Sequence, residues 1–185
     1  MKKTEKKIIN ICKLSIKASQ ILSKTKNSER NKALKIIAKK IIKNKDHILF
    51  QNKKDLFEAK KSGLSKSFVD RLFLDDKRIL SLSRDILNIV KLKDPLGKVL
   101  NKSIRPNGLK ISKITVPLGL IAVIFESRPN VASDVAALCI KSGNAVILKG
   151  GKEAKFTTES IIKIVKQGLK EANIDDKGVT SLKDY

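Results

Sequence analysis

The first ninety residues of the chain place apolar side chains at helical spacing. Isoleucine, leucine and alanine recur three and four positions apart over residues 8–22, 34–42, 48–59 and 79–90. A shorter piece, residues 65–72, lies between the third and fourth of these stretches. The pattern predicts an N-terminal part built entirely from helices.

Residues that favour helix ends mark the boundaries of these stretches. Ser28, Asp46 and Asp75 each stand where a helix is expected to begin, and their side chains could accept a hydrogen bond from the first turn. Gly63 is expected to end the third helix. The fourth helix should end before Pro95, because the residue before a proline disfavours helical backbone.

Between residues 99 and 116 the pattern changes from helical spacing to partial alternation. Two short stretches, residues 99–105 and 109–116, flank a Pro-Asn-Gly sequence at residues 106–108. Proline, asparagine and glycine together are a strong turn signal. The segment therefore predicts a β-hairpin with one lysine-rich face.

From residue 118 onwards, continuous apolar runs alternate with helical stretches. The expected order is strand, helix, strand, helix and strand, over residues 118–125, 131–142, 145–148, 157–172 and 179–182. A continuous apolar run is typical of a parallel strand that is covered on both faces. The chain is therefore expected to be an α/β protein: N-terminal helices, a β-hairpin, then the first half of a Rossmann-like parallel sheet.

The net charge of +23 raises the question of a polyanionic partner. The 185 residues contain 41 Lys and Arg against 18 Asp and Glu, but only six of the basic residues are arginine. Nucleic-acid readers favour arginine and aromatic side chains, and aromatic residues are only 4% of this chain. The lysines are spread along the chain, so the charge indicates a lysine-coated surface and no specific nucleic acid. A nucleic-acid-binding module remains the alternative.

The cysteines and the histidine give no sign of a metal site. Cys12 and Cys139 are far apart, neither lies in a C-x-x-C sequence, and His47 is the single histidine. Both cysteines sit among apolar residues, which favours buried, inert thiols. No apolar run approaches the roughly 18 residues of a membrane span, and no signal peptide is recognisable, so a cytoplasmic protein is expected.

Two strings in the C-terminal half carry a specific resemblance. Residues 126–131 read Glu-Ser-Arg-Pro-Asn-Val, and residues 142–151 read Ser-Gly-Asn-Ala-Val-Ile-Leu-Lys-Gly-Gly. With Asp-Pro-Leu-Gly at 94–97 and Arg-Pro-Asn-Gly-Leu at 105–109, the chain resembles the N-terminal part of the gamma-glutamyl phosphate reductase family, in the aldehyde dehydrogenase superfamily. The resemblance covers essentially the whole chain.

The resemblance implies an oxidoreductase of proline biosynthesis. Such an enzyme uses NADPH to reduce L-glutamyl 5-phosphate to L-glutamate 5-semialdehyde, with release of phosphate. In the family a cysteine thiolate attacks the acyl phosphate, and the hairpin belongs to an oligomerisation arm. The resemblance therefore also implies a homo-oligomer formed through the hairpin, and glutamate 5-kinase as a further partner.

Two residues match the family's substrate side. Asn130 matches an asparagine whose amide would stabilise the oxyanion of the tetrahedral intermediate. Its alternative role is an N-cap that accepts the Ser133 N–H. Arg128 could bind a phosphate or carboxylate group of the substrate, and its alternative is a salt bridge with Glu126 or Asp134.

Four residues after the second apolar run match the cofactor side. Lys149 stands where members of the superfamily contact the adenosine ribose or its 2′-phosphate, and a cation there suits NADPH. Gly150 and Gly151 would let the backbone approach the cofactor. Glu153 could face the ribose or simply begin a helix as a favourable acid.

The family's nucleophilic cysteine has no match in this chain, because neither Cys12 nor Cys139 lies in its position. The expected division is a helical segment of the cofactor domain at 1–93, the hairpin arm at 94–117 and a first β-α-β-α-β portion of the NADPH-binding domain at 118–185. The catalytic domain is expected to be absent. The chain is thus expected to be an N-terminal fragment that is inactive by itself; the alternative is a non-catalytic nucleotide- or nucleic-acid-binding remnant.

Overall fold

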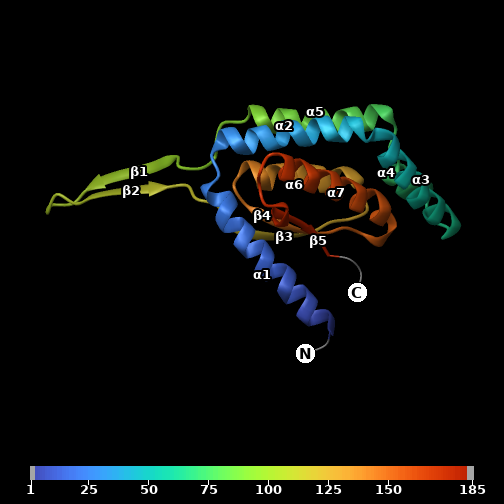
Figure 1. Cartoon of the computed structure of the whole chain (residues 1–185), viewed down its shortest axis with the longest axis horizontal. Helices are drawn as coiled ribbons and strands as arrows, with labels where there is room; N and C mark the ends of the chain where they lie inside the picture. The colour runs from blue at the N-terminus through green and yellow to red at the C-terminus, as the bar shows by residue number, and fades with distance from the viewer. Residues whose placement is uncertain (1–2, 183–185) are drawn as a thin grey trace.

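Helices make up the first half of the chain, as the apolar spacing predicts. The computed structural model describes residues 3–182. Its first elements are α1 (Lys3–Lys24), α2 (Asn27–Lys43), α3 (Lys45–Lys61), α4 (Lys66–Leu72) and α5 (Asp76–Lys91) (Figure 1). None of the helices in this described range is both long and apolar enough to cross a membrane.

Some helix ends follow the predicted signals. Asp75 caps α5, where its side chain accepts a hydrogen bond of 2.7 Å from the Arg78 N–H. Gly63 follows the end of α3 with a φ of +69°, a left-handed conformation that costs glycine little. α5 ends at Lys91, ahead of Pro95, as expected.

The predicted caps at Ser28 and Asp46 are wrong. α2 already begins at Asn27, because the Glu29 carboxylate accepts the Lys26 N–H at 2.9 Å and closes the first turn without Ser28. α3 begins at Lys45, directly after Asn44, so Asp46 lies inside the first turn. There its negative charge interacts favourably with the positive N-terminal end of the helix dipole, but its side chain does not cap the helix.

The second half contains the predicted hairpin and the predicted β-α-β-α-β unit. In the hairpin, β1 (Val99–Ile104) pairs antiparallel with β2 (Lys110–Ile114). The later elements are β3 (Leu120–Ile124), α6 (Pro129–Lys141), β4 (Ala145–Lys149), the 3₁₀ turn η1 (Lys152–Ala154), α7 (Lys155–Glu171), the 3₁₀ turn η2 (Asp176–Gly178) and β5 (Val179–Ser181).

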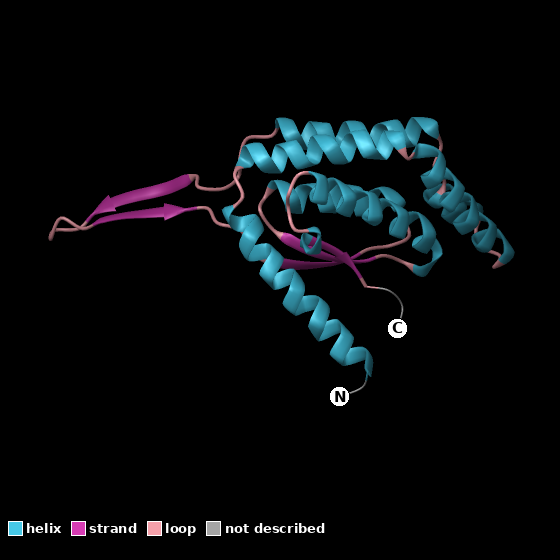
Figure 2. Ribbon diagram, in the orientation of Figure 1, coloured by secondary structure: helices cyan, strands magenta, loops and turns pink. Residues whose placement is uncertain are grey.

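The parallel sheet has the order β3-β4-β5. α6 and α7 lie together on one face, α1 crosses the other face, and α2 and α5 form an outer layer over α6 and α7 (Figure 2). Residues 145–148 of β4 are fully buried, as a central strand requires. β3 was also expected to be covered on both faces, and this is wrong: among the described residues, 3–182, it is an edge strand, and Ile124 is 84% exposed.

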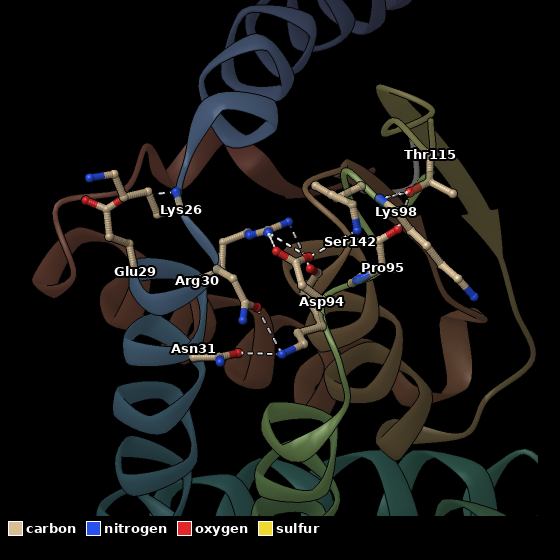
Figure 3. A network of polar contacts seen from close by, with 12 residues as sticks. Lys26, Glu29, Arg30, Asn31, Asp94, Pro95, Lys98, Thr115 and Ser142 are labelled. Carbon is tan, nitrogen blue, oxygen red and sulfur yellow. Dashed lines mark hydrogen bonds and ion pairs between the residues drawn. The ribbon is translucent and has the colours of Figure 1, made fainter. Parts of the chain in front are cut away.

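A buried arginine joins three distant segments of the chain. The Arg30 side chain, on α2, is 2% exposed. Its guanidinium donates to both carboxylate oxygens of Asp94 at 2.9 Å and to the Lys141 carbonyl at 3.0 Å (Figure 3). Asp94 lies in the connection between α5 and β1, and Lys141 ends α6. Nη2 makes both contacts to Asp94 and Nη1 makes the contact to Lys141, so Arg30 holds the outer helices, the base of the hairpin and the sheet unit together.

The side chain of Lys141 completes this junction. Its ammonium group donates to Asn31 Oδ1 at 2.8 Å, to Asn27 Oδ1 at 3.1 Å and to the Val90 carbonyl at 3.1 Å. Burial lowers the pKa of Lys141, because a charge is costly away from water. The three neutral acceptors replace the lost hydration and tie α6 to both outer helices.

Replacing Arg30 should destabilise the fold strongly. In Arg30→Leu, Asp94 and the Lys141 carbonyl lose their donor, and we expect the free energy of unfolding to fall by about 3 kcal/mol in urea titrations. Glu171→Ala is the matched control. It breaks an ion pair of 2.7 Å with Lys40, but Glu171 is 55% exposed, so its loss should cost less than about 1 kcal/mol. Equal losses for the two variants would contradict the role given to Arg30.

Candidate cofactor and substrate site

Two loops meet at the carboxyl edge of the sheet. One follows β3 and the other follows β4, and the ladder between the strands is extended by a hydrogen bond of 3.0 Å from the Phe125 N–H to the Lys149 carbonyl. Beyond it, the Ser127 hydroxyl donates to the Glu153 carboxylate at 2.6 Å. The two family-like strings, distant in sequence, therefore form one surface. In open α/β sheets this edge is the usual place for ligands.

The loop after β4 opens into a groove. The groove has a volume of about 330 Å³, within the range of small-ligand sites, and Lys149, Gly150 and Gly151 line it together. Lys152 and Lys155 also line it, and the sequence reasoning missed both. The sequence pattern that could have indicated them is a lysine at every third position from 149 to 155. This pattern is hard to recognise in a chain so rich in lysine.

The groove carries more positive than negative charge. Lys149, Lys152 and Lys155 face one carboxylate, Glu159. The Lys155 ammonium is partly engaged, because it lies 3.6 Å from Glu58. A second groove of about 440 Å³ shares Glu159 with the first and continues along α7 past His47. The two grooves together could hold a long anionic ligand.

The N-terminus of α7 does not offer its amides to this groove. Asp55, on α3, accepts hydrogen bonds from the Phe156 and Thr157 N–H groups at 3.1 and 2.8 Å, and from the Thr157 hydroxyl at 2.6 Å. Burial raises the pKa of Asp55, while these hydrogen bonds oppose the rise. Since a carboxylate already accepts from these two amides, they are not available to an anion in the groove, and the lysine side chains supply its positive charge.

Arg128 is exposed in the loop after β3. Neither salt bridge considered for it from the sequence forms. Glu126 instead pairs with Arg71 at 3.2 Å, and Asp134 accepts from Asn130 and Ser133. The guanidinium can therefore meet a ligand in this loop without first breaking either of those two pairs.

Asn130 does not cap α6. The helix begins at Pro129 with Arg128 in the capping position, and Asn130 lies inside the first turn. Its amide nitrogen donates to Asp134 at 3.2 Å, and burial raises the pKa of Asp134. An amide nitrogen carries two hydrogens, so this bond to Asp134 uses one and leaves the second for an oxyanion.

Neither cysteine has the surroundings of a nucleophile. Cys139 is 6% exposed within α6, and burial raises the pKa of its thiol to about 11. A buried thiol of this kind is inert, because the thiolate is the reactive form. The expectation that Cys12 is also buried is wrong, because its side chain is partly exposed on α1. α1 crosses the face of the sheet opposite α6 and α7 (Figure 2). Within residues 3–182, no three His, Cys, Asp or Glu side chains are grouped to hold a metal ion.

Curated proteins similar to this chain include several gamma-glutamyl phosphate reductases. The gamma-glutamyl phosphate reductase of Carboxydothermus hydrogenoformans is 44% identical over 176 residues, which is 95% of this chain and 42% of that protein. The enzyme of the same name from Clostridium perfringens is 46% identical over 167 residues, or 90% of this chain and 40% of that protein. The chain thus spans about two fifths of the curated relatives it matches. No protein-family profile matches it.

Solved structures agree with the sequence comparison. The crystal structure of gamma-glutamyl phosphate reductase from Thermotoga maritima superposes with a TM-score of 0.92 at 36% identity, over 94% of this chain and 42% of that chain. An acetylating aldehyde dehydrogenase from Geobacillus thermoglucosidasius, at 17% identity and a TM-score of 0.69, covers 96% of this chain and 36% of its own and shares the fold. In sequence and in fold, the chain corresponds to the N-terminal part of the gamma-glutamyl phosphate reductases, and it shares its fold with aldehyde dehydrogenases.

Proposed function

We propose that this chain binds NADPH in the groove at the carboxyl end of β4, as part of a gamma-glutamyl phosphate reductase. The observation that carries the proposal is the gathering of Lys149, Gly150 and Gly151 in one groove with two further lysines. NADPH differs from NADH by a 2′-phosphate, which a cluster of lysines would favour. Glu153, held beside the groove by Ser127, would complete the cofactor side of the site.

The loop after β3 supplies the proposed substrate side. Arg128 would bind an anionic group of L-glutamyl 5-phosphate, and the second amide hydrogen of Asn130 would stabilise the oxyanion that forms at the acyl carbon. Ser127 joins this loop to the cofactor loop, so the two sides are held in a fixed relation. The overall reaction is reduction of the acyl phosphate to L-glutamate 5-semialdehyde, with the hydride supplied by NADPH.

We further propose that the nucleophile of this reaction is neither Cys12 nor Cys139. The high pKa and burial of Cys139 support this for one thiol, and the place of Cys12 on the opposite side of the sheet supports it for the other. The proposed division is a helical segment at 1–93, a hairpin arm at 94–117 and the first portion of the NADPH-binding domain at 118–185, with the catalytic domain outside these residues.

Two further parts of the proposal concern the cell. A proline-biosynthetic reductase would work in the cytoplasm, where its cofactor is kept reduced. Glutamate 5-kinase makes the acyl phosphate, which water hydrolyses readily, and this favours direct transfer between kinase and reductase. Co-purification of the kinase with the intact reductase would test this partnership.

Replacing Lys149 should weaken NADPH binding selectively. With Lys149→Ala we expect the Kd for NADPH, measured by fluorescence titration, to rise about tenfold, because one charge-assisted contact to phosphate is lost. The Kd for NADH should change much less. Lys102→Ala, on the exposed strand β1, removes the same charge away from the groove and should leave both constants unchanged.

A different result would favour the alternative function. If the unchanged chain bound random-sequence DNA at nanomolar strength, with a steep dependence on salt, and ignored NADPH, a nucleic-acid-binding module would be the better interpretation. Micromolar, non-specific DNA binding would only reflect the net charge of +23.

The chain alone should not turn over substrate. We expect no NADPH oxidation above the blank when it is mixed with L-glutamyl 5-phosphate, since Cys139 is protonated and buried at neutral pH. In the folded protein, a thiol reagent at pH 8 should modify Cys12 before Cys139. Turnover that disappears in Cys139→Ser or Cys12→Ser would overturn the assignment of the nucleophile to another segment.

The hairpin is the proposed surface for association between copies of the protein. Every residue of β1 and β2 is exposed, including Ile104 at 71% and Ile111 at 41%, and an isolated two-stranded hairpin is only marginally stable in water. Sedimentation should show self-association that Ile104→Lys with Ile111→Lys abolishes while circular dichroism stays unchanged. A monomer at all concentrations would count against this arm.

A further inference from the structure

Ser127 is a buried serine between the two functional loops. Its side chain is 5% exposed, although Glu126 and Arg128 on either side are both exposed. The hydroxyl donates to Glu153 at 2.6 Å, a short distance that is typical of a bond to a charged acceptor. The bond therefore spans from the loop after β3 to the turn after β4.

The glycine between these partners leaves no room for a side chain. A Cβ added to Gly151 would overlap the Ser127 hydroxyl and would lie 2.9 Å from the Glu153 carboxylate and 3.2 Å from the Ser127 backbone nitrogen. Gly151 also lines the proposed cofactor groove. The hydrogen bond and the wall of the groove are thus one packed unit.

The Glu153 carboxylate lies close to the charges that would receive a phosphate. Glu153 lines a cavity of about 490 Å³ together with Lys152 and Lys155, and these same lysines line the groove. A carboxylate that moved along this wall would compete with a phosphate for the ammonium groups. The Ser127 hydroxyl opposes such movement, because it donates to the carboxylate and keeps it against the loop after β3.

We infer that Ser127 is a positioning residue that determines the preference for NADPH over NADH, because its hydroxyl fixes where the Glu153 carboxylate lies relative to the lysines of the groove. The inference rests on the proposed function. Ser127 would not touch the cofactor itself. Ser127 would act on the 2′-phosphate only indirectly, because it sets the position of the negatively charged Glu153 carboxylate. NADH lacks that phosphate, so its binding would depend on Ser127 far less.

The test compares the two cofactors on the same variants by fluorescence titration. We expect Ser127→Ala to raise the Kd for NADPH about fivefold and to change the Kd for NADH less than twofold. Ser127→Thr keeps a hydroxyl and should restore the preference. Ser83→Ala is the matched control: Ser83 is also buried, at 6%, but donates to the Ala38 carbonyl between α5 and α2. It should not change the ratio of the two constants.

A second set of variants removes the carboxylate instead of the hydroxyl. With Glu153→Gln there is no negative charge to hold, so adding Ser127→Ala should leave the NADPH-to-NADH ratio unchanged, a non-additive pair in the sense of a double-mutant cycle. Gly151→Ala keeps both partners but forces them apart, and it should shift the ratio in the same direction as Ser127→Ala.

The outcomes separate this inference from the proposed function. If the unchanged chain binds no NADPH, the proposed function fails and the inference fails with it. If the chain binds NADPH but Ser127→Ala weakens the binding of both cofactors equally, or raises the NADPH-to-NADH ratio of Kd values just as much on the Glu153→Gln background, Ser127 is only structural and the inference alone is overturned.

Discussion

The fold depends on one buried guanidinium group. The Arg30 side chain is 2% exposed, and burying a guanidinium group is costly unless it has hydrogen-bond acceptors. Asp94 and Lys141 supply these acceptors, from 64 and 111 residues away in the sequence. The hydrogen bonds of its two terminal nitrogens bring the outer helices, the base of the hairpin and the end of α6 to a single point. The first crossover of the sheet, and with it the loop after β3, is placed by this junction.

The order of elements could be predicted from the sequence because local patterns carry it. Apolar spacing gave the helices, the Pro-Asn-Gly turn gave the hairpin, and short apolar runs gave the strands. Helix starts were less secure, because several polar side chains compete for the same amides. Glu29 closed the first turn of α2 ahead of Ser28, and only one residue, Asn44, separates α2 from α3.

In the site as well, features within one segment could be predicted from the sequence, and contacts between distant segments could not. The string around Lys149 could be found because glycines and a strand end stand beside it, whereas Lys152 and Lys155 were hidden among 41 basic residues. The bond from Ser127 to Glu153 and the placement of Glu126 beside Arg71 join segments 26 and 55 residues apart. No spacing rule within one helix or strand reaches so far, and such pairs become visible only when the sheet brings the loops together.

Asp55 gives the groove a particular kind of binding chemistry. Its carboxylate takes the Phe156 and Thr157 amides of α7, which are the rigid helix-terminus donors that many nucleotide sites use. A phosphate in the groove would therefore meet long lysine side chains in place of these two amides. Each lysine must give up rotamer freedom to hold a ligand. Exposed ammonium groups are also screened over a Debye length of roughly 8–10 Å at physiological ionic strength. Cofactor affinity in this protein would therefore be sensitive to dissolved ions, and the acid buried beneath the groove is the reason.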